Sequence, residues 1–110
     1  MDDKSLKFQL TKYIGERKSL HENDSFAIYK KWEELIELLS EHENETINLI
    51  QNSTKDEIDW ISEVMEEVSA NLNSNDYIAA LKKISIKYPD CNLDYTIEIS
   101  IKHMSKNHET

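Results

Sequence analysis

Histidine and cysteine, the side chains that most often bind metals or attack substrates, are few and poorly placed in this sequence. The four histidines are His21, His42, His103 and His108. None has a second histidine four residues away or a glutamate three residues before it, so the helical spacings that bind zinc or a di-iron centre are missing. Cys91 follows Asp90, whose charge opposes the thiolate that a nucleophilic cysteine needs. We expect no metal site and no catalytic cysteine.

Acid–base and phosphate chemistry are equally poorly supported. Gly15 is the only glycine, and glycine-rich loops that cradle phosphates need several. Carboxylates are plentiful, but general acid catalysis requires one carboxyl in an apolar pocket, and glutamates spaced along exposed helix faces do not provide it. The sequence therefore predicts a protein that is not an enzyme and that has no cofactor.

The acidic residues are concentrated in the middle of the chain. The net charge is −9, and residues 21–76 carry 15 acidic against 3 basic side chains, a net charge of −12. Direct binding to nucleic acid needs a basic footprint, as does binding to an anionic membrane. We expect neither ligand, and a basic protein is the natural complement.

One tryptophan lies among these carboxylates. On a helical projection, Trp60 points away from the apolar face and shares an arc with Asp56, Glu63 and Glu67, beside Asp59. Acidic side chains attract a basic partner at long range, and a tryptophan can anchor it once desolvated. The alternative is that Trp60 packs against a neighbouring helix.

We therefore expect two groups of partner-binding residues. The first group is Trp60, Asp56, Asp59, Glu63 and Glu67. The second group, on the polar face of the preceding long helix, is Glu33, Glu37 and Glu41. On this hypothesis, Trp60→Ala leaves the fold intact and weakens partner binding at least about tenfold.

The elements that position these residues are all helical. One glycine and one proline in 110 residues is far too few for the turns of a sheet protein. Apolar periodicity and capping residues predict helices over residues 5–18, 25–40, 45–51, 55–72, 76–88 and 93–104. Gly15 is a candidate end for the first helix, and Asp24 or Ser25 and Ser53 or Thr54 are candidate caps. The apolar stripe of the second helix is Ile28, Tyr29, Trp32, Leu35, Ile36 and Leu39.

These helices predict one all-α domain over residues 1–104, with a frayed tail at residues 105–110. Short loops favour about six antiparallel helices, either in a compact bundle or in a short HEAT-like stack of helical hairpins. The residues expected to be structural are Trp32, Leu35, Ile61, Val68, Leu81, Ile84 and Tyr88. A single cysteine, the lack of a signal peptide and the lack of a long apolar run predict a cytoplasmic protein, and we expect a monomer.

Residues 57–104 resemble a family. A helix with a tryptophan and several acids is followed by a polar break, then by Asp76-Tyr77-Ile78, Leu81, Ile84 and Lys87-Tyr88-Pro89, and then by another amphipathic helix. This pattern resembles small α-helical immunity proteins of bacterial polymorphic and contact-dependent toxin systems.

The resemblance implies an antitoxin that binds and neutralises a cognate toxin carboxyl-terminal domain. Many such toxins are nucleases with basic clefts, which an acidic helical face would complement. The alternative is an acidic DNA mimic or adaptor that sequesters a basic nucleic-acid-binding protein. Both interpretations require a protein partner and an acidic docking face.

Overall fold

The computed structural model describes residues 5–108, and over these residues the chain forms helices joined by short loops, without strands. The predicted all-α class is confirmed. The helices are α1 (Leu6–Lys18), α2 (Ser25–Ser40), α3 (Glu43–Gln51), α4 (Lys55–Ile61), α5 (Met65–Leu72), α6 (Asn75–Lys87) and α7 (Asp94–His108), with 3₁₀ turns η2 (Ser62–Val64) and η3 (Pro89–Cys91).

Side-chain caps fix where several helices begin. The Asp24 side chain accepts from the Ala27 backbone N–H at the start of α2. Thr54 and Glu57 form a reciprocal capping box at the start of α4, which satisfies two backbone N–H groups that the helix leaves without partners. The Ser74 side chain caps α6 by accepting from the Tyr77 backbone N–H at 3.1 Å. Of the predicted alternatives, Asp24 rather than Ser25 caps α2, and Thr54 rather than Ser53 caps α4.

The helix predicted over residues 55–72 is interrupted in the middle. The turn η2 separates α4 from α5, and Val64 has φ −124° and ψ 9°, outside the helical region. The Ser62 hydroxyl donates to the Asp59 carbonyl oxygen at 2.6 Å, a local bond that competes with regular helix bonding. A single continuous helix was therefore the wrong prediction, and residues on α4 and α5 do not share one helical face.

The end of α1 agrees with the predicted range, whereas the end of α7 does not. Gly15 does not end α1, which continues to Lys18, because this exposed position places no special demand on the backbone. The last helix, α7, continues past residue 104 to His108. The remainder of the expected tail, residues 109–110, lies outside the described part of the chain.

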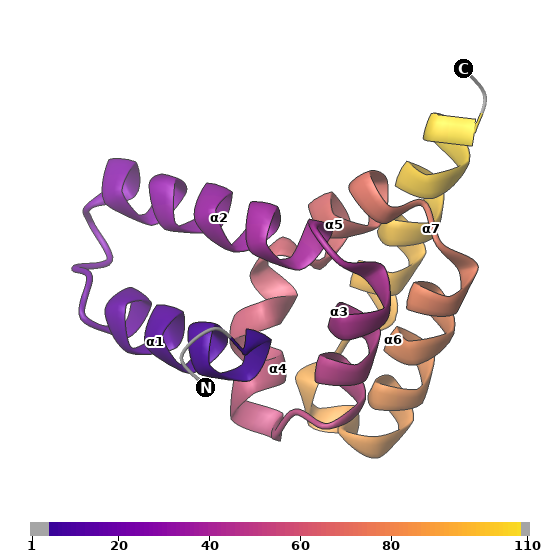
Figure 1. Ribbon diagram of the computed structural model, residues 1–110, viewed down its shortest axis with the longest axis horizontal. Helices are drawn as coiled ribbons and strands as arrows, with labels where there is room; N and C mark the ends of the chain where they lie inside the picture. The colour runs from indigo at the N-terminus through magenta and orange to yellow at the C-terminus, as the bar shows by residue number, and fades with distance from the viewer. Residues whose placement is uncertain (1–4, 109–110) are drawn as a thin grey trace.

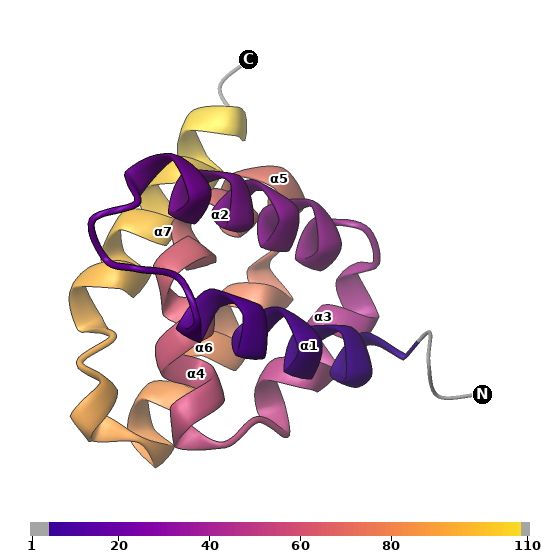
Figure 2. The same cartoon turned by 90° about the vertical axis from the view of Figure 1, so that its left-hand side faces the viewer.

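The helices gather around one core, with principal extents of 36 × 31 × 28 Å. These similar dimensions match a compact bundle better than a hairpin stack. In Figure 1, α1 and α2 run antiparallel at one side, and α3 to α7 fill the other. The turn by 90° in Figure 2 brings the α1–α2 pair to the front.

The core contains most of the residues expected to be structural. The side chains of Leu35, Ile61, Val68, Leu81 and Ile84 are at most 2% exposed, and Trp32 and Tyr88 are partly buried against them. Small side chains allow α5 and α7 to pack closely, because Ser69 and Ser100 are both fully buried and the Ser69 hydroxyl donates to the Ser100 carbonyl oxygen at 2.7 Å. No helix within residues 5–108 has the length and apolar character needed to cross a bilayer.

Candidate interaction surface

Glu63 is the centre of a polar network between α1, α2 and η2. Arg17 Nε and Nη2 donate to Glu63 Oε1 and Oε2 at 3.1 and 2.9 Å. The Trp32 indole N–H also donates to Glu63 Oε1, at 2.9 Å. The Arg17 and Glu63 side chains are only 13% and 25% exposed, so this two-point ion pair is shielded from water and stronger than a surface pair. Glu63 therefore connects three elements of the bundle.

Trp60 lies directly beside this network. Its ring is half-buried and packs against the core. The Arg17 guanidinium carbon lies 5.1 Å from the ring centroid, and Lys18 Nζ lies 6.0 Å from it. Cations at these distances are attracted to the face of an indole. The chain's own α1 thus covers Trp60 with the positive charge that an external basic partner would have supplied.

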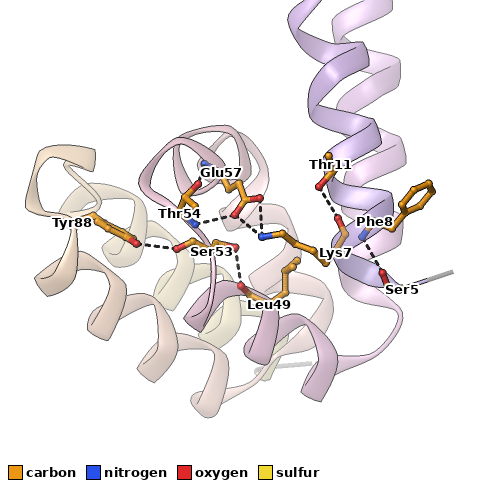
Figure 3. A network of polar contacts seen from close by, with 9 residues as sticks. All are labelled: Ser5, Lys7, Phe8, Thr11, Leu49, Ser53, Thr54, Glu57 and Tyr88. Carbon is orange, nitrogen blue, oxygen red and sulfur yellow. Dashed lines mark hydrogen bonds and ion pairs between the residues drawn. The ribbon is translucent and has the colours of Figure 1, made fainter. Parts of the chain in front are cut away.

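Two more ion pairs join α1 to α4. Lys18 Nζ lies 3.3 Å from Asp56 Oδ2, and Lys7 Nζ lies 2.9 Å from Glu57 Oε2. Figure 3 shows Lys7 reaching from α1 to Glu57 in the Thr54 capping box. We call the set of these contacting residues the α1–α4 seam. It consists of Lys7, Arg17, Lys18, Asp56, Glu57, Trp60 and Glu63.

The contacts of the seam change the pKa of the Glu57 carboxylate. Partial burial by itself would raise its pKa, but the backbone N–H of Thr54 and the ammonium of Lys7 outweigh this effect and lower the pKa. The neighbouring Ser53 is fixed as well, because its hydroxyl donates to the Leu49 carbonyl and its own carbonyl accepts from the Tyr88 hydroxyl, as Figure 3 shows. The seam is therefore continuous with the well-bonded interior.

The structure divides the first predicted group of partner-binding residues. Asp56, Trp60 and Glu63 lie in the seam, in contact with cations of α1. Asp59 lies near Cys91, and Glu67 is exposed on α5, beyond the break. The five residues do not form the single face that an unbroken helix would have given. Their role in binding a partner stays a prediction, and their observed contacts are within the chain.

The second predicted group is arranged differently. Glu33 and Glu37 on α2 and Glu41 at its C-cap are exposed, and none of them forms an ion pair with the described side chains of residues 5–104. Their spacing of four residues places them on one side of the helix. No cation among the described side chains thus lies within ion-pair distance of these three carboxylates.

Two aromatic residues extend this face toward the start of α2. Phe26 is 74% exposed and Tyr29 is 60% exposed, although Tyr29 was expected in the apolar stripe. That expectation was wrong because the stripe is narrower, with Ile28, Leu35 and Leu39 as its buried residues. We call the set Phe26, Tyr29, Glu33, Glu37 and Glu41 the α2 outer face. Sequence reasoning overlooked Phe26, although its position seven residues before Glu33 places it on the same side of a helix.

A groove runs beside the α2 outer face, between α2 and α1. It has a volume of about 1240 Å³, and its lining includes Lys12 and Tyr13 of α1 and Glu33, Glu34 and Glu37 of α2. Tyr13 is only 2% exposed. Burial, together with the negative charge of Glu63, raises its pKa to about 12, so its hydroxyl stays protonated at neutral pH. Lys31 Nζ, which is paired with Glu16 and Glu34, lies 5.3 Å from the centroid of the Tyr13 ring, so a cation of the chain already covers this phenol.

Within the described part of the chain, no three histidine, cysteine, aspartate or glutamate residues are close enough to hold a metal ion. Burial, reinforced by nearby Asp59, raises the pKa of the Cys91 thiol to about 11, which keeps it in its unreactive protonated form.

Comparison with known proteins gives no relative. No family model matches this chain, and no curated protein or solved structure matches it either. The features that bear on function are therefore the two helix surfaces and the sequence pattern of residues 57–104.

Proposed function

We propose that this protein is an immunity protein that neutralises a cognate toxin domain by binding it, and that the α2 outer face is its docking surface. The observation that carries the proposal is the contrast in charge pairing. Glu33, Glu37 and Glu41 are exposed and form no ion pair with the side chains of residues 5–104, whereas the carboxylates of the seam are held by α1. Charges left unneutralised within a chain are available to a partner.

The chemistry of the face favours a basic protein as the partner. Carboxylates act over a screening length of about 8 Å at physiological salt and accelerate the encounter with a basic protein. Phe26 and Tyr29, which are 74% and 60% exposed, supply the aromatic contacts that commonly dominate binding energy after docking. A nuclease toxin offers a complementary surface, since its substrate cleft must carry positive charge.

The resemblance of residues 57–104 to immunity proteins supports the same proposal. In the structure, these residues supply much of the core and include α5, α6 and most of α7. The α1–α4 seam then fixes the α1–α2 pair against this core. The proposed arrangement is a rigid carboxyl-terminal half that presents an acidic amino-terminal helix.

The test is co-expression with the product of the gene immediately upstream. Rescue of growth, with a complex that copurifies, is the expected result. The discriminating variant is Glu33→Gln/Glu37→Gln/Glu41→Gln. Its control is Asp76→Asn/Asp90→Asn/Glu98→Gln, which removes three exposed acids elsewhere and gives the same net charge.

We expect the α2 variant to lose protection and to bind at least about tenfold more weakly, mainly through slower association, while the control binds nearly normally. Binding of the unmodified protein should also weaken as salt rises from low to molar. Equal losses in the two variants would show that only net charge matters. Binding to a nucleic-acid-binding protein of the host without any effect on the toxin would favour the adaptor alternative.

A further inference from the structure

The exposed side of α6 carries three lysines around an isoleucine. Lys82, Lys83 and Lys87 are all exposed, and none of them forms an ion pair with the side chains of residues 5–104. Ile86 is 82% exposed. Because a helix advances about 100° per residue, these four side chains fall within one arc of about 140°, with Ile86 between the lysines. We call this set the α6 outer face.

The positive charge of the α6 outer face is not balanced within its own helix. Asp76 is the only acid of α6, and it lies about two turns before Lys83, at the start of the helix. Lys87 Nζ lies 5.3 Å from the centroid of the neighbouring Tyr88 ring, which carries no charge. The cations of the seam, in contrast, are each paired with a carboxylate. The α6 outer face is therefore suited to an acidic surface of another molecule.

The α2 outer face has the complementary charge and a similar layout. Its three glutamates lie on successive turns about 6 Å apart, and Lys83 and Lys87 repeat this spacing on α6. Lys30 is the one cation on this side of α2, with its Nζ 5.6 Å from the centroid of the Phe26 ring, so the face keeps a net negative charge. Phe26 adds apolar surface to it, as Ile86 does to the α6 outer face.

We propose that the α6 outer face of one copy of this chain docks on the α2 outer face of a second copy. Figure 1 places α2 and α6 on different sides of the molecule, and in the turned view of Figure 2 α2 lies in front of α6. One copy cannot bring its own two faces together, so the contact is head-to-tail and adds further copies. Two helix faces bury less than about 1,200 Å², the range of weak and transient contacts, so the dilute chain stays monomeric.

This contact goes beyond the proposed function but uses the same α2 outer face. A second copy and the toxin therefore compete for that face, and self-association covers it until the toxin displaces the copy. Variants of the α6 lysines should keep protection against the toxin, since α6 is not part of the proposed toxin-docking surface.

The first experiment is sedimentation velocity of the purified full chain at rising concentration, up to about 1 mM. At about 0.15 M salt, repulsion between copies of net charge −9 is screened beyond about 8 Å, whereas close opposite charges still attract. The test variant is Lys83→Glu/Lys87→Glu. Its control is Lys55→Glu/Lys102→Glu, which reverses two exposed lysines of α4 and α7 and gives the same net charge.

We expect the average mass of the unmodified chain and of the control to rise with concentration. The test variant should associate at least about tenfold more weakly, because like charges then meet across the contact. An unmodified chain that stays monomeric at about 1 mM would overturn the inference, and so would equal association of the two variants.

An exchange of charges identifies the two faces that meet. Glu33→Lys/Glu37→Lys reverses the α2 outer face, so this variant should also stay monomeric. Mixing it with Lys83→Glu/Lys87→Glu restores opposite charges across the contact. The mixture should therefore form complexes that neither variant forms alone, and a mixture that stays monomeric would contradict the proposal.

Ile86→Ala tests the apolar part of the contact without a change in charge. Its control is Phe8→Ala, which removes a side chain that is 48% exposed on α1. We expect Ile86→Ala to weaken self-association about three- to tenfold, since apolar side chains at the centre of an interface contribute much of its binding energy. Equal association of the two variants would show that the copies do not meet through α6.

These measurements need no toxin, so the two proposals can fail separately. If the exchanged pair associates but co-expression gives no protection, the contact between copies stands and the immunity function is wrong. If the α2 outer face is required for protection but the chain stays monomeric at about 1 mM, the function stands and the contact between copies is wrong.

Discussion

The α1–α4 seam and the α2 outer face both place acidic side chains beside aromatic rings on amphipathic helices, yet the carboxylates of the seam are in ion pairs and those of the α2 outer face are not. In the seam, Glu63 is bonded by Arg17 and Trp32, and Trp60 is covered by cations. On the α2 outer face, Glu37 forms no ion pair with the side chains described, those of residues 5–104. Phe26 has Lys30 Nζ 5.6 Å from its ring centroid, but it is 74% exposed. A helix face of acidic and aromatic side chains is therefore structural where another helix supplies cations to it, and it stays open to a partner where no helix does.

The largest expected difference between the two regions is in the stability of glutamate variants. Glu63→Ala leaves Arg17, which is 13% exposed, without its partner and also removes the acceptor of the Trp32 indole. We expect a loss of about 2–4 kcal/mol in the free energy of unfolding, below the cost of breaking a fully buried pair. Urea unfolding would measure it.

Glu33→Ala is the matched control on the α2 outer face, and it should change stability by less than about 0.5 kcal/mol. Similar losses for the two variants would mean that the contrast in pairing has no energetic consequence. The seam and the α2 outer face would then not differ in their contribution to stability.

Removal of Trp60 or of Phe26 should give a smaller difference in the free energy of unfolding, again with the larger loss in the seam. Trp60→Ala opens space beside the core and removes the ring under Arg17, so we expect a loss of about 2 kcal/mol, since the half-buried ring should cost less than a fully buried one. Phe26→Ala should be nearly neutral for stability. Thermal unfolding of the two variants checks this.

This prediction revises the expectation that Trp60→Ala leaves the fold untouched. Native stability of that variant, together with weaker partner binding, would return Trp60 to the docking surface. The seam would then be a binding site as well as a structural contact.

The smallest expected effect is in the acid sensitivity of the seam. The pKa of Glu57 is lowered in the folded protein, so its contribution to stability is present above the unfolded pKa of about 4.3 and is lost as the pH falls through the lower folded pKa. We expect Glu57→Gln to remove about 1 kcal/mol at neutral pH and to flatten the fall in stability toward low pH. Urea unfolding across this pH range measures both effects.

Lys7→Gln provides the corresponding check. Removal of the ammonium should bring the pKa of Glu57 closer to its usual value, so part of the acid sensitivity should disappear while the bond from Thr54 remains. An unchanged dependence on pH in both variants would show that the seam does not stabilise the fold through Glu57.

Features set by neighbours within one helical turn could be predicted from the sequence. The scarcity of glycine and proline gave the all-α class, and Asp24 and Thr54 marked two helix starts through bonds to residues three positions away. Apolar periodicity identified most of the core, including Leu35, Ile61 and Leu81. These features depend on local geometry, which repeats along a helix and is visible in the order of residues.

Tertiary structure alone decided which acidic residues remain available. The bond from Lys7 to Glu57 spans 50 residues and that from Arg17 to Glu63 spans 46, so no local pattern indicates them. The turn at residues 62–64 rotated α5 relative to α4, and the packing of α1 over Trp60 left α2 as the open acidic face. Ion pairs form between side chains that are close in space, and helix packing determines that closeness.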